Sequence, residues 1–175
     1  LRAEDPEGET LSFSIASGTS GSFGVSSSGQ IFVKAAADLD YESQVNHVVY
    51  IDISDGTLSS SMDVEIRLTD VNEIPEFAKE EYSMAVSEQS AASTRVGEVI
   101  KASDHDAGDT VSFELRSSSN SQYFELTTSE DGGYYCAQLS AKIAIPDINQ
   151  FASATFDLIV RITDSAGLEA DMSVE

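Results

Sequence analysis

Residues 62–77, MDVEIRLTDVNEIPEF, contain the two features on which the fold prediction rests. From Met62 to Thr69, apolar and polar side chains alternate strictly. This period of two is typical of a β-strand with one buried face and one wet face. The second half brings acids, an amide and Pro75, which cannot donate to a strand ladder. The stretch therefore predicts a strand that runs into a joint between two domains.

The same alternation recurs along the chain, separated by clusters of Gly, Ser and Asp that are typical of turns. The recurrences are residues 11–15, 49–53, 111–115 and 156–162. No long segment sustains the i, i+3, i+4 apolar pattern of a helix, and residues 35–37 and 90–93 are expected to form short helical turns at most. The pattern predicts an all-β protein.

An internal repeat divides the chain in two. AEDPEGETLSFSI at 3–15 matches ASDHDAGDTVSFEL at 102–115, and VYIDISDG at 49–56 matches IVRITDSAG at 159–167. We therefore expect two copies of one β domain, covering 1–74 and 75–175. The first would lack its opening strand and the second would end inside its last, so the chain is taken as a fragment. Turns every 8–12 residues favour two tandem seven-stranded Greek-key sandwiches joined by a short linker.

Composition narrows the function. The chain has 31 acids against 9 basic residues, a net charge of −22, which disfavours nucleic acid and anionic membranes. The acidity could serve solubility alone, or some acids could bind divalent cations. No segment has 18 consecutive apolar residues, and the single cysteine, Cys136, is expected to be a buried small hydrophobe rather than half of an interchain disulfide.

The position of the acids favours the cation hypothesis, because they cluster in loops. The clusters are Asp5 with Glu7, Asp38 to Glu42, Asp55, Asp70 to Glu73, and Asp104 with Asp106, while Asp164 repeats Asp55. Ca²⁺ prefers six to eight oxygen ligands of these kinds. An EF-hand is excluded for the loop that begins at Asp104, because its flanks are strands and Leu115 stands at its twelfth position.

No P-loop, G-x-G-x-x-G or G-x-S-x-G motif is present, so the chain is not expected to be an enzyme.

Five stretches of the chain resemble the motifs of cadherin repeats in their sequence, their order and their spacing. LDYE (39–42) resembles L-D-R/Y-E, DVNEIPEF (70–77) the linker D-x-N-D-N-x-P-x-F, DHDAGD (104–109) D-x-D-x-G-x-N, RITDSAG (161–167) the A-x-D-x-G element, and VSEQS (86–90) the early glutamate element. The resemblance covers essentially the whole chain. It implies tandem extracellular sandwiches with three calcium ions bound between consecutive repeats.

The resemblance also implies a ligand set. The metal ligands would be Asp40, Glu42, Asp70, Asn72, Glu73, Asp104, Asp106 and Asp164, with the backbone carbonyls of Val71 and Ile74. Glu73 and Thr110 depart from the family's Asp and Asn. In the second repeat the counterparts of Asp40 and Glu42 are Asn149 and Phe151, so calcium at a following linker would be weak or absent. Asp5, Glu7 and Asp55 would form half a site toward a preceding repeat.

The resemblance implies a calcium-dependent cell-adhesion ectodomain, at the cell surface of a membrane-anchored parent, with a homophilic or heterophilic cadherin-type partner. No Trp is present to insert into a partner. Two alternatives stay open: a cadherin-like accessory or carbohydrate-binding module of a secreted or bacterial surface protein, and a calcium-independent Ig-like spacer. His105, between two candidate ligands, is expected to be a solvent-facing spacer, and His47 a surface or edge residue.

Overall fold

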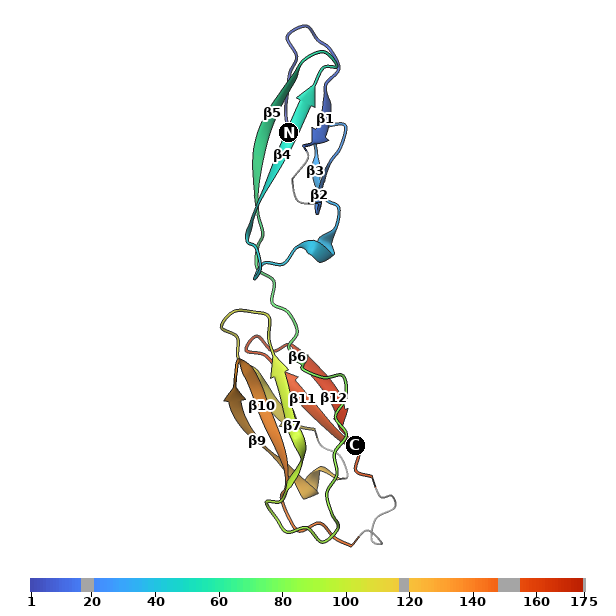
Figure 1. Cartoon of the computed structure of the whole chain (residues 1–175), viewed down its shortest axis with the longest axis vertical. Helices are drawn as coiled ribbons and strands as arrows, with labels where there is room; N and C mark the ends of the chain where they lie inside the picture. The colour runs from blue at the N-terminus through green and yellow to red at the C-terminus, as the bar shows by residue number, and fades with distance from the viewer. Residues whose placement is uncertain (17–20, 117–119, 148–154, 175) are drawn as a thin grey trace. The chain divides into compact units, whose positions relative to one another are not determined.

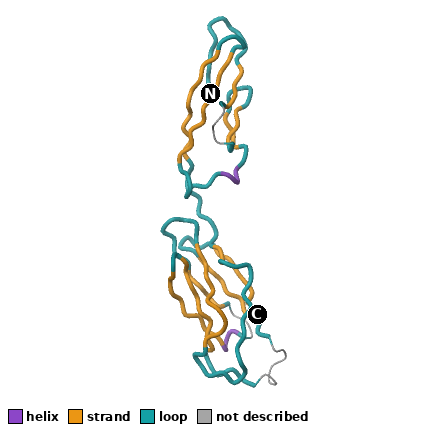
Figure 2. Tube along the Cα trace, viewed as in Figure 1, coloured by secondary structure: helices purple, strands orange, loops and turns teal. Residues whose placement is uncertain are grey.

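The computed structural model describes residues 1–16, 21–116, 120–147 and 155–174. The chain forms two compact units, unit 1 (Leu1–Val71) and unit 2 (Asn72–Glu175), each built from antiparallel strands (Figure 1). Helix is confined to two short 3₁₀ turns, η1 (Ala36–Asp38) and η2 (Ser121–Tyr123), and strands and loops make up the rest of the described chain (Figure 2). The all-β prediction is confirmed, as is a helical turn within residues 35–37.

Unit 2 is a two-sheet sandwich. Its strands are β6 (Glu76–Phe77), β7 (Arg95–Ser103), β8 (Ser112–Leu115), β9 (Phe124–Asp131), β10 (Tyr134–Ala141), β11 (Leu158–Thr163) and β12 (Glu169–Val174). One sheet has the order β6-β7-β10-β9 and the other β12-β11-β8. Alternate residues of each strand point inward, so that Ile100, Leu139 and Val160 lie in one buried cluster. This core fixes the positions of the loops at the ends of the strands.

Unit 1 has a smaller set of strands. These are β1 (Ser12–Ile15), β2 (Phe23–Val25), β3 (Ile31–Val33), β4 (Asn46–Ser54) and β5 (Ser59–Arg67). They form a three-stranded sheet, β1-β4-β5, and a two-stranded sheet, β2-β3. Phe23, Val49 and Ile51 are the buried apolar residues of its described core. Unit 1 therefore buries a smaller core than unit 2.

The structure shows whether three side chains are buried or exposed as predicted from the sequence. Cys136 is buried on β10 and His105 is exposed, as expected. The prediction for His47 is wrong, because its side chain is buried. It lies on the same face of β4 as Val49 and Ile51, and its ring meets that of Phe23 edge-on, with the centroids 5.5 Å apart.

Candidate metal centre

The candidate ligands of unit 2 come from loops that follow or precede its strands. Asp104 and Asp106 follow β7, Asp109 precedes β8, Asp164 follows β11, and Asn72 precedes β6. The antiparallel register pairs Thr163 with Ser112 and Glu76 with Ser103, which brings these loops to one end of the sandwich. The sheet order therefore assembles acids that lie up to 60 residues apart along the sequence.

Three carboxylates form the centre of this cluster. One oxygen each from Asp104, Asp109 and Asp164 lies within 4.8 Å of the others. Asp164 is only 6% exposed, and the other two are partly buried. Within the described residues, Asp104 Oδ2 and Asp109 Oδ2 are buried and have no hydrogen-bond partner. Unpartnered buried carboxylate oxygens are costly, and a bound cation would remove that cost.

The electrostatics of Asp104 reflect this crowding. Its pKa is raised above the ordinary value, chiefly because burial disfavours the charged carboxylate, and the negative charges of Asp106, Asp109 and Asp164 add to the shift. A backbone hydrogen bond from Asp106 N to Asp104 Oδ1, 2.9 Å long, acts in the opposite direction. The site thus disfavours its own negative charge, which a cation would neutralise.

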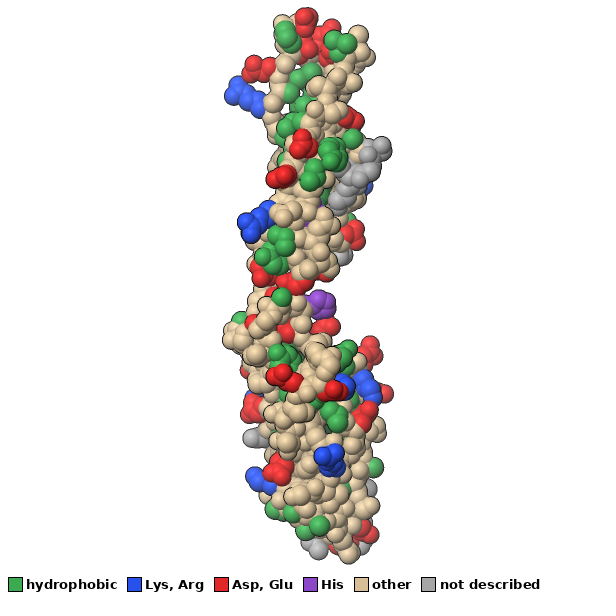
Figure 3. All heavy atoms as spheres, turned by 60° about the vertical axis from the view of Figure 1, so that its left-hand side comes forward, with side chains coloured by type: hydrophobic (Ala, Val, Ile, Leu, Met, Phe, Trp, Pro, Cys, Tyr) green, Lys and Arg blue, Asp and Glu red, His purple; other side chains and the backbone are tan. Residues whose placement is uncertain are grey.

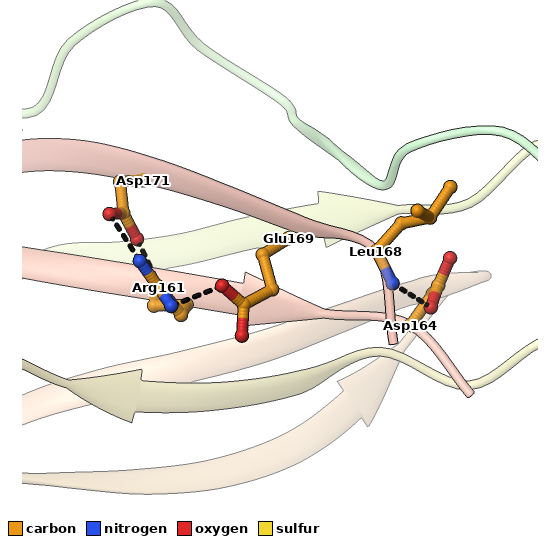
Figure 4. Close-up of polar contacts among 5 residues, drawn as sticks. All are labelled: Arg161, Asp164, Leu168, Glu169 and Asp171. Atoms are coloured by element: carbon orange, nitrogen blue, oxygen red, sulfur yellow. Dashed lines mark hydrogen bonds and ion pairs between the residues drawn. The ribbon is translucent and has the colours of Figure 1, made fainter. Parts of the chain in front are cut away.

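Asp164 is held by hydrogen bonds from two sides. Leu168 N donates to its Oδ1 at 2.7 Å (Figure 4), Gly167 N donates to the same oxygen, and Asn72 Nδ2 donates to Oδ2 at 2.7 Å. Burial by itself would raise the pKa of Asp164, but these hydrogen bonds together lower it. Asp164 is therefore an ionised carboxylate in a fixed orientation. Asn72, a predicted ligand, positions it.

The segment after Asn72 is tied to the same loop. Glu73 N donates to Asp106 Oδ2 at 2.8 Å, and Asp106 N donates to Asp104. Of the ten predicted ligands, five thus gather at one end of unit 2: Asn72, Glu73, Asp104, Asp106 and Asp164. The side chains of Val71 and Ile74 are hydrocarbons without a donor atom, so only their backbone carbonyls could serve as ligands.

Unit 1 holds the other three predicted ligands. One carboxylate oxygen of Glu42 lies within 4.8 Å of one of Asp70. Asp40 accepts hydrogen bonds from Ser43 N at 3.1 Å and Ser43 Oγ at 2.6 Å, so it caps the turn that carries Glu42. The structure therefore brings Glu42 and Asp70 together and gives Asp40 a local structural role.

Asp109 is the residue that sequence reasoning missed. It is the third acid of DHDAGD, and the resemblance gave ligand roles only to the first two. Its backbone carbonyl accepts a hydrogen bond from Tyr135 Oη at 2.8 Å, and Ser165 Oγ donates to its Oδ1. These contacts hold Asp109 against Asp164, a long-range pairing that no local motif reports.

The half-site expected at the start of unit 1 is organised by turns. Asp55 Oδ1 accepts hydrogen bonds from Leu58 N at 2.7 Å and Thr57 N at 2.6 Å, and these lower its pKa. Asp5 Oδ1 accepts from Glu7 N and Glu9 N. Asp5 and Asp55 both line a hollow of about 210 Å³. Asn149 and Phe151, the expected counterparts of Asp40 and Glu42, lie outside the described residues.

Other acids of unit 2 are neutralised by a cation of the chain itself. Arg161 on β11 binds Asp171 through two parallel bonds, Nε to Oδ1 at 2.7 Å and Nη2 to Oδ2 at 2.8 Å, and it also pairs with Glu169 (Figure 4). The hydrogen bond from Arg161 lowers the pKa of Asp171. The chain has 31 acids against nine basic residues, and acidic side chains are spread over the face in Figure 3.

Comparison with known proteins agrees with this architecture. No protein-family model matches the chain. Human cadherin-22 is 38% identical over 107 residues, covering 55% of this chain and 13% of cadherin-22. Mouse cadherin EGF LAG seven-pass G-type receptor 1 is 34% identical over 113 residues, covering 62% of this chain and 4% of that protein. The chain thus spans a small part of the curated relatives it matches.

Solved structures show the same fold. The crystal structure of human protocadherin-24 EC1-2, form II, matches with a TM-score of 0.62 at 19% identity, covering 100% of this chain and 85% of that chain. The fold is that of tandem antiparallel β-sandwich repeats with acidic loops. The chain is thus similar in sequence to parts of cadherins and in fold to a pair of protocadherin EC domains, which supports its assignment to the cadherin superfamily. The part of the chain that the structure describes contains no helix with the length and hydropathy of a membrane span.

Proposed function

We propose that unit 2 binds Ca²⁺ through the carboxylates of Asp104, Asp109 and Asp164, and that the chain acts in calcium-dependent cell adhesion. The observation that carries the proposal is the pair of buried, unpartnered oxygens, Asp104 Oδ2 and Asp109 Oδ2, within a carboxylate cluster. A cation is the partner that would satisfy both oxygens and offset the mutual repulsion of the carboxylates.

The donor set favours calcium over other metals. The cluster offers only hard oxygen ligands, without a Cys or His among its members. Ca²⁺ accepts flexible geometry with six to eight oxygens, so backbone carbonyls and water can complete its shell, whereas Zn²⁺ selects nitrogen and sulfur. Extracellular calcium modules bind with dissociation constants of about 10⁻⁴ to 10⁻³ M, which is the range expected here.

The proposal extends to the segment that joins the units, and this part rests on the sequence. Candidate ligands stand on both sides of the boundary: Asp40, Glu42 and Asp70 before it, and Asn72, Glu73, Asp104 and Asp106 after it, with the carbonyls of Val71 and Ile74 between. The closeness of Glu42 to Asp70 supports a contribution from unit 1. Ions shared in this way would favour one arrangement of the units over many, because they bind that arrangement more tightly.

Thermal unfolding tests the calcium site. At about 10 mM calcium, a site of this affinity is expected to add about 1.4–2.7 kcal/mol to the free energy of unfolding of unit 2. Asp109→Asn is expected to lose most of this gain. Glu125→Gln, which removes an exposed carboxylate on β9, should keep it. An equal calcium response from Asp109→Asn and the unchanged protein would contradict the proposed role of Asp109.

Small-angle scattering tests the effect on the joint. If calcium restrains the linker, chelation broadens the distribution of distances between the units, and restoring calcium narrows it again. The variant Asp70→Asn should reduce that response, because it removes a carboxylate contributed by unit 1. A distance distribution that does not change on chelation would overturn this part of the proposal.

The adhesive role extends to the parent protein, an extracellular ectodomain anchored at a cell surface. Its partner would be a cadherin-type ectodomain, either another copy or a different member. Beads that carry the parent ectodomain are expected to aggregate in calcium and to disperse in chelator. Aggregation that is equally strong in chelator would favour a calcium-independent spacer instead.

A further inference from the structure

The inner face of β9 changes character along the strand. Phe124, at its start, is buried in the core of unit 2. The antiparallel register with β10 then pairs Thr128 with Ala137, which is fully buried. It also pairs Glu130 with Tyr135, which packs against a second buried cluster. Because cross-strand partners share a face, Thr128 and Glu130 lie on the inner face, although both are exposed. A carboxylate thus stands where a sandwich usually places an apolar side chain.

A hollow of about 410 Å³ lies beside these two positions of β9. Thr128 and Glu130 contribute a hydroxyl group and a carboxylate to its lining. The opposite wall is apolar and aromatic, because Val111 and Phe113 line the hollow from the β8 side and Tyr135 lines it from β10. The hollow therefore combines a surface for hydrocarbon and ring contacts with one negative charge at its edge.

The strands that line the hollow are both sheet edges. In the described part of the chain, β9 is the last strand in the order β6-β7-β10-β9 (Figure 1), and β8 is the last in the order β12-β11-β8. With β10 on one side only, alternate residues of the eight in β9 direct their backbone N–H and C=O groups away from the sheet. The free edge of β9 therefore offers backbone hydrogen-bonding groups directly beside the hollow.

Charge decides which kind of segment fits this edge. The acids of β9 are Glu125, Glu130 and Asp131, and Lys101 pairs with Asp131 at 3.1 Å. No ion pair among the described residues involves Glu125 or Glu130. If two copies of β9 paired antiparallel about their midpoints, Glu125 would lie opposite Glu130, and like charges at opposite positions are destabilising. The edge therefore disfavours a second copy of itself and favours a basic segment.

We propose that β9 binds an extended basic segment of another protein, which adds to its free edge and inserts an arginine side chain into the hollow. The guanidinium group pairs with the Glu130 carboxylate, while its stem and planar head lie against the rings of Phe113 and Tyr135. Tyr135 Oη donates a hydrogen bond to the Asp109 carbonyl at 2.8 Å, which fixes one of these rings. Backbone hydrogen bonds to β9 give affinity, and the alternate side chains give specificity.

An acetylated and amidated octapeptide of alternating Thr and Arg serves as the probe, because alternation places every Arg on one face of a strand. It is titrated into the isotope-labelled whole chain in chelator, at about 150 mM salt to screen non-specific attraction. The NMR signals of Val111, Thr128 and Glu130 are expected to shift. Amide hydrogen exchange in β9 is expected to slow about tenfold, and exchange in β12 should not change.

Matched variants separate the hollow from general acidity. Glu130→Gln should weaken peptide binding about tenfold, because the charged partner of the arginine is lost. Glu125→Gln removes the same charge from the opposite face of the same strand, and it should change the affinity less than about twofold. A peptide of the same composition with its Arg residues contiguous should leave exchange in β9 unchanged.

Four results would each overturn the proposal. They are no binding of the alternating peptide, equal weakening by Glu130→Gln and Glu125→Gln, equal protection of β9 by the two peptides, and signal shifts confined to the loop of residues 104–109. Arginine amide that binds as tightly as the peptide would also overturn it, because no segment would then be needed. Since calcium is chelated throughout, failure here leaves the calcium proposal untouched.

Discussion

Asp104 lies in the carboxylate cluster of unit 2 and has a raised pKa. Its pKa is raised in the folded protein, so its contribution to stability is fully present below its unfolded pKa and is lost as pH rises through the folded value. In chelator, unit 2 should therefore lose stability through this group as pH rises above the ordinary Asp pKa of 3.8. Near pH 7 the calcium-free site is destabilised by its own charge.

Asp104→Asn should raise the melting temperature of unit 2 in chelator at neutral pH, by about 3 °C. The amide oxygen can still accept the bond from Asp106 N, but the charge is gone. With calcium added, the variant should gain less than the unchanged protein, because a ligand is lost. Melting curves between pH 4 and 7, with Glu125→Gln as the exposed control, measure both effects. A variant that is less stable than the unchanged protein in chelator would contradict this view of Asp104.

Gly97 is a second residue with a testable role. It has φ +60°, and a Cβ built on it would lie 2.4 Å from Cγ of Met84. Gly132 has the same φ, with nothing within 4 Å of a built Cβ. Gly97→Ala should cost about 2–3 kcal/mol of unfolding free energy, against about 1 kcal/mol for Gly132→Ala, since only the first adds a clash to backbone strain.

Chemical denaturation of the two glycine variants measures the difference. Combining Gly97→Ala with Met84→Ala should recover part of the loss, because the smaller side chain makes room. Equal costs for the two glycine substitutions would show that Met84 does not press on Gly97 in solution.

Residues differ in how far the sequence reveals them. His47 was predictable in principle, because it shares the period of Val49 and Ile51, but its polarity favoured the surface. Asp109 was not, because its role depends on Asp164, 55 residues away in sequence, and on the sheet that joins them. Local motifs identified most candidate ligands. Asp109 became a candidate only through the pairing of β8 with β11, which brings it close to Asp164.

Strands also differ in how clearly the sequence predicts them. The alternation of β4, β5 and β11 made them predictable. β7 lacked that signal, because its pairing with β10 shifts register between Ala137 and Leu139, and Gly97 interrupts the alternation. β2 has three residues, too few to show a period. Strands with regular alternation of apolar and polar residues can thus be predicted from the sequence. Strands that are very short or interrupted, such as β2 and β7, cannot.

Met172 on β12 is buried, whereas Met62 on β5 is partly exposed, and this difference between the two units predicts different effects of mutation. Met172→Ala should destabilise unit 2 by about 2–4 kcal/mol, because it leaves a cavity in a closed core. Met62→Ala should cost unit 1 less than about 1 kcal/mol, because that side chain is already 40% exposed. Denaturant titrations followed by methyl NMR report each unit separately. Similar costs in both units would contradict the difference in burial between Met62 and Met172.

The whole molecule combines two sandwiches with an excess of 22 negative charges. The internal repeat predicted two β domains before any coordinates, because tandem copies share turns and acids at fixed spacing. The sequence could not show which acids lack partners, since Arg161 neutralises Asp171 while Asp104 and Asp109 keep unsatisfied oxygens. That distinction depends on side-chain geometry, and the proposed calcium site rests on it.

Isothermal titration calorimetry of calcium into the whole chain tests the central claim most directly. Calcium is expected to bind with a dissociation constant of about 10⁻⁴ to 10⁻³ M. The double variant Asp104→Asn with Asp109→Asn should weaken it at least tenfold, and Glu125→Gln should leave it unchanged. No binding at millimolar calcium, or a double variant that binds as the unchanged chain does, would contradict the account.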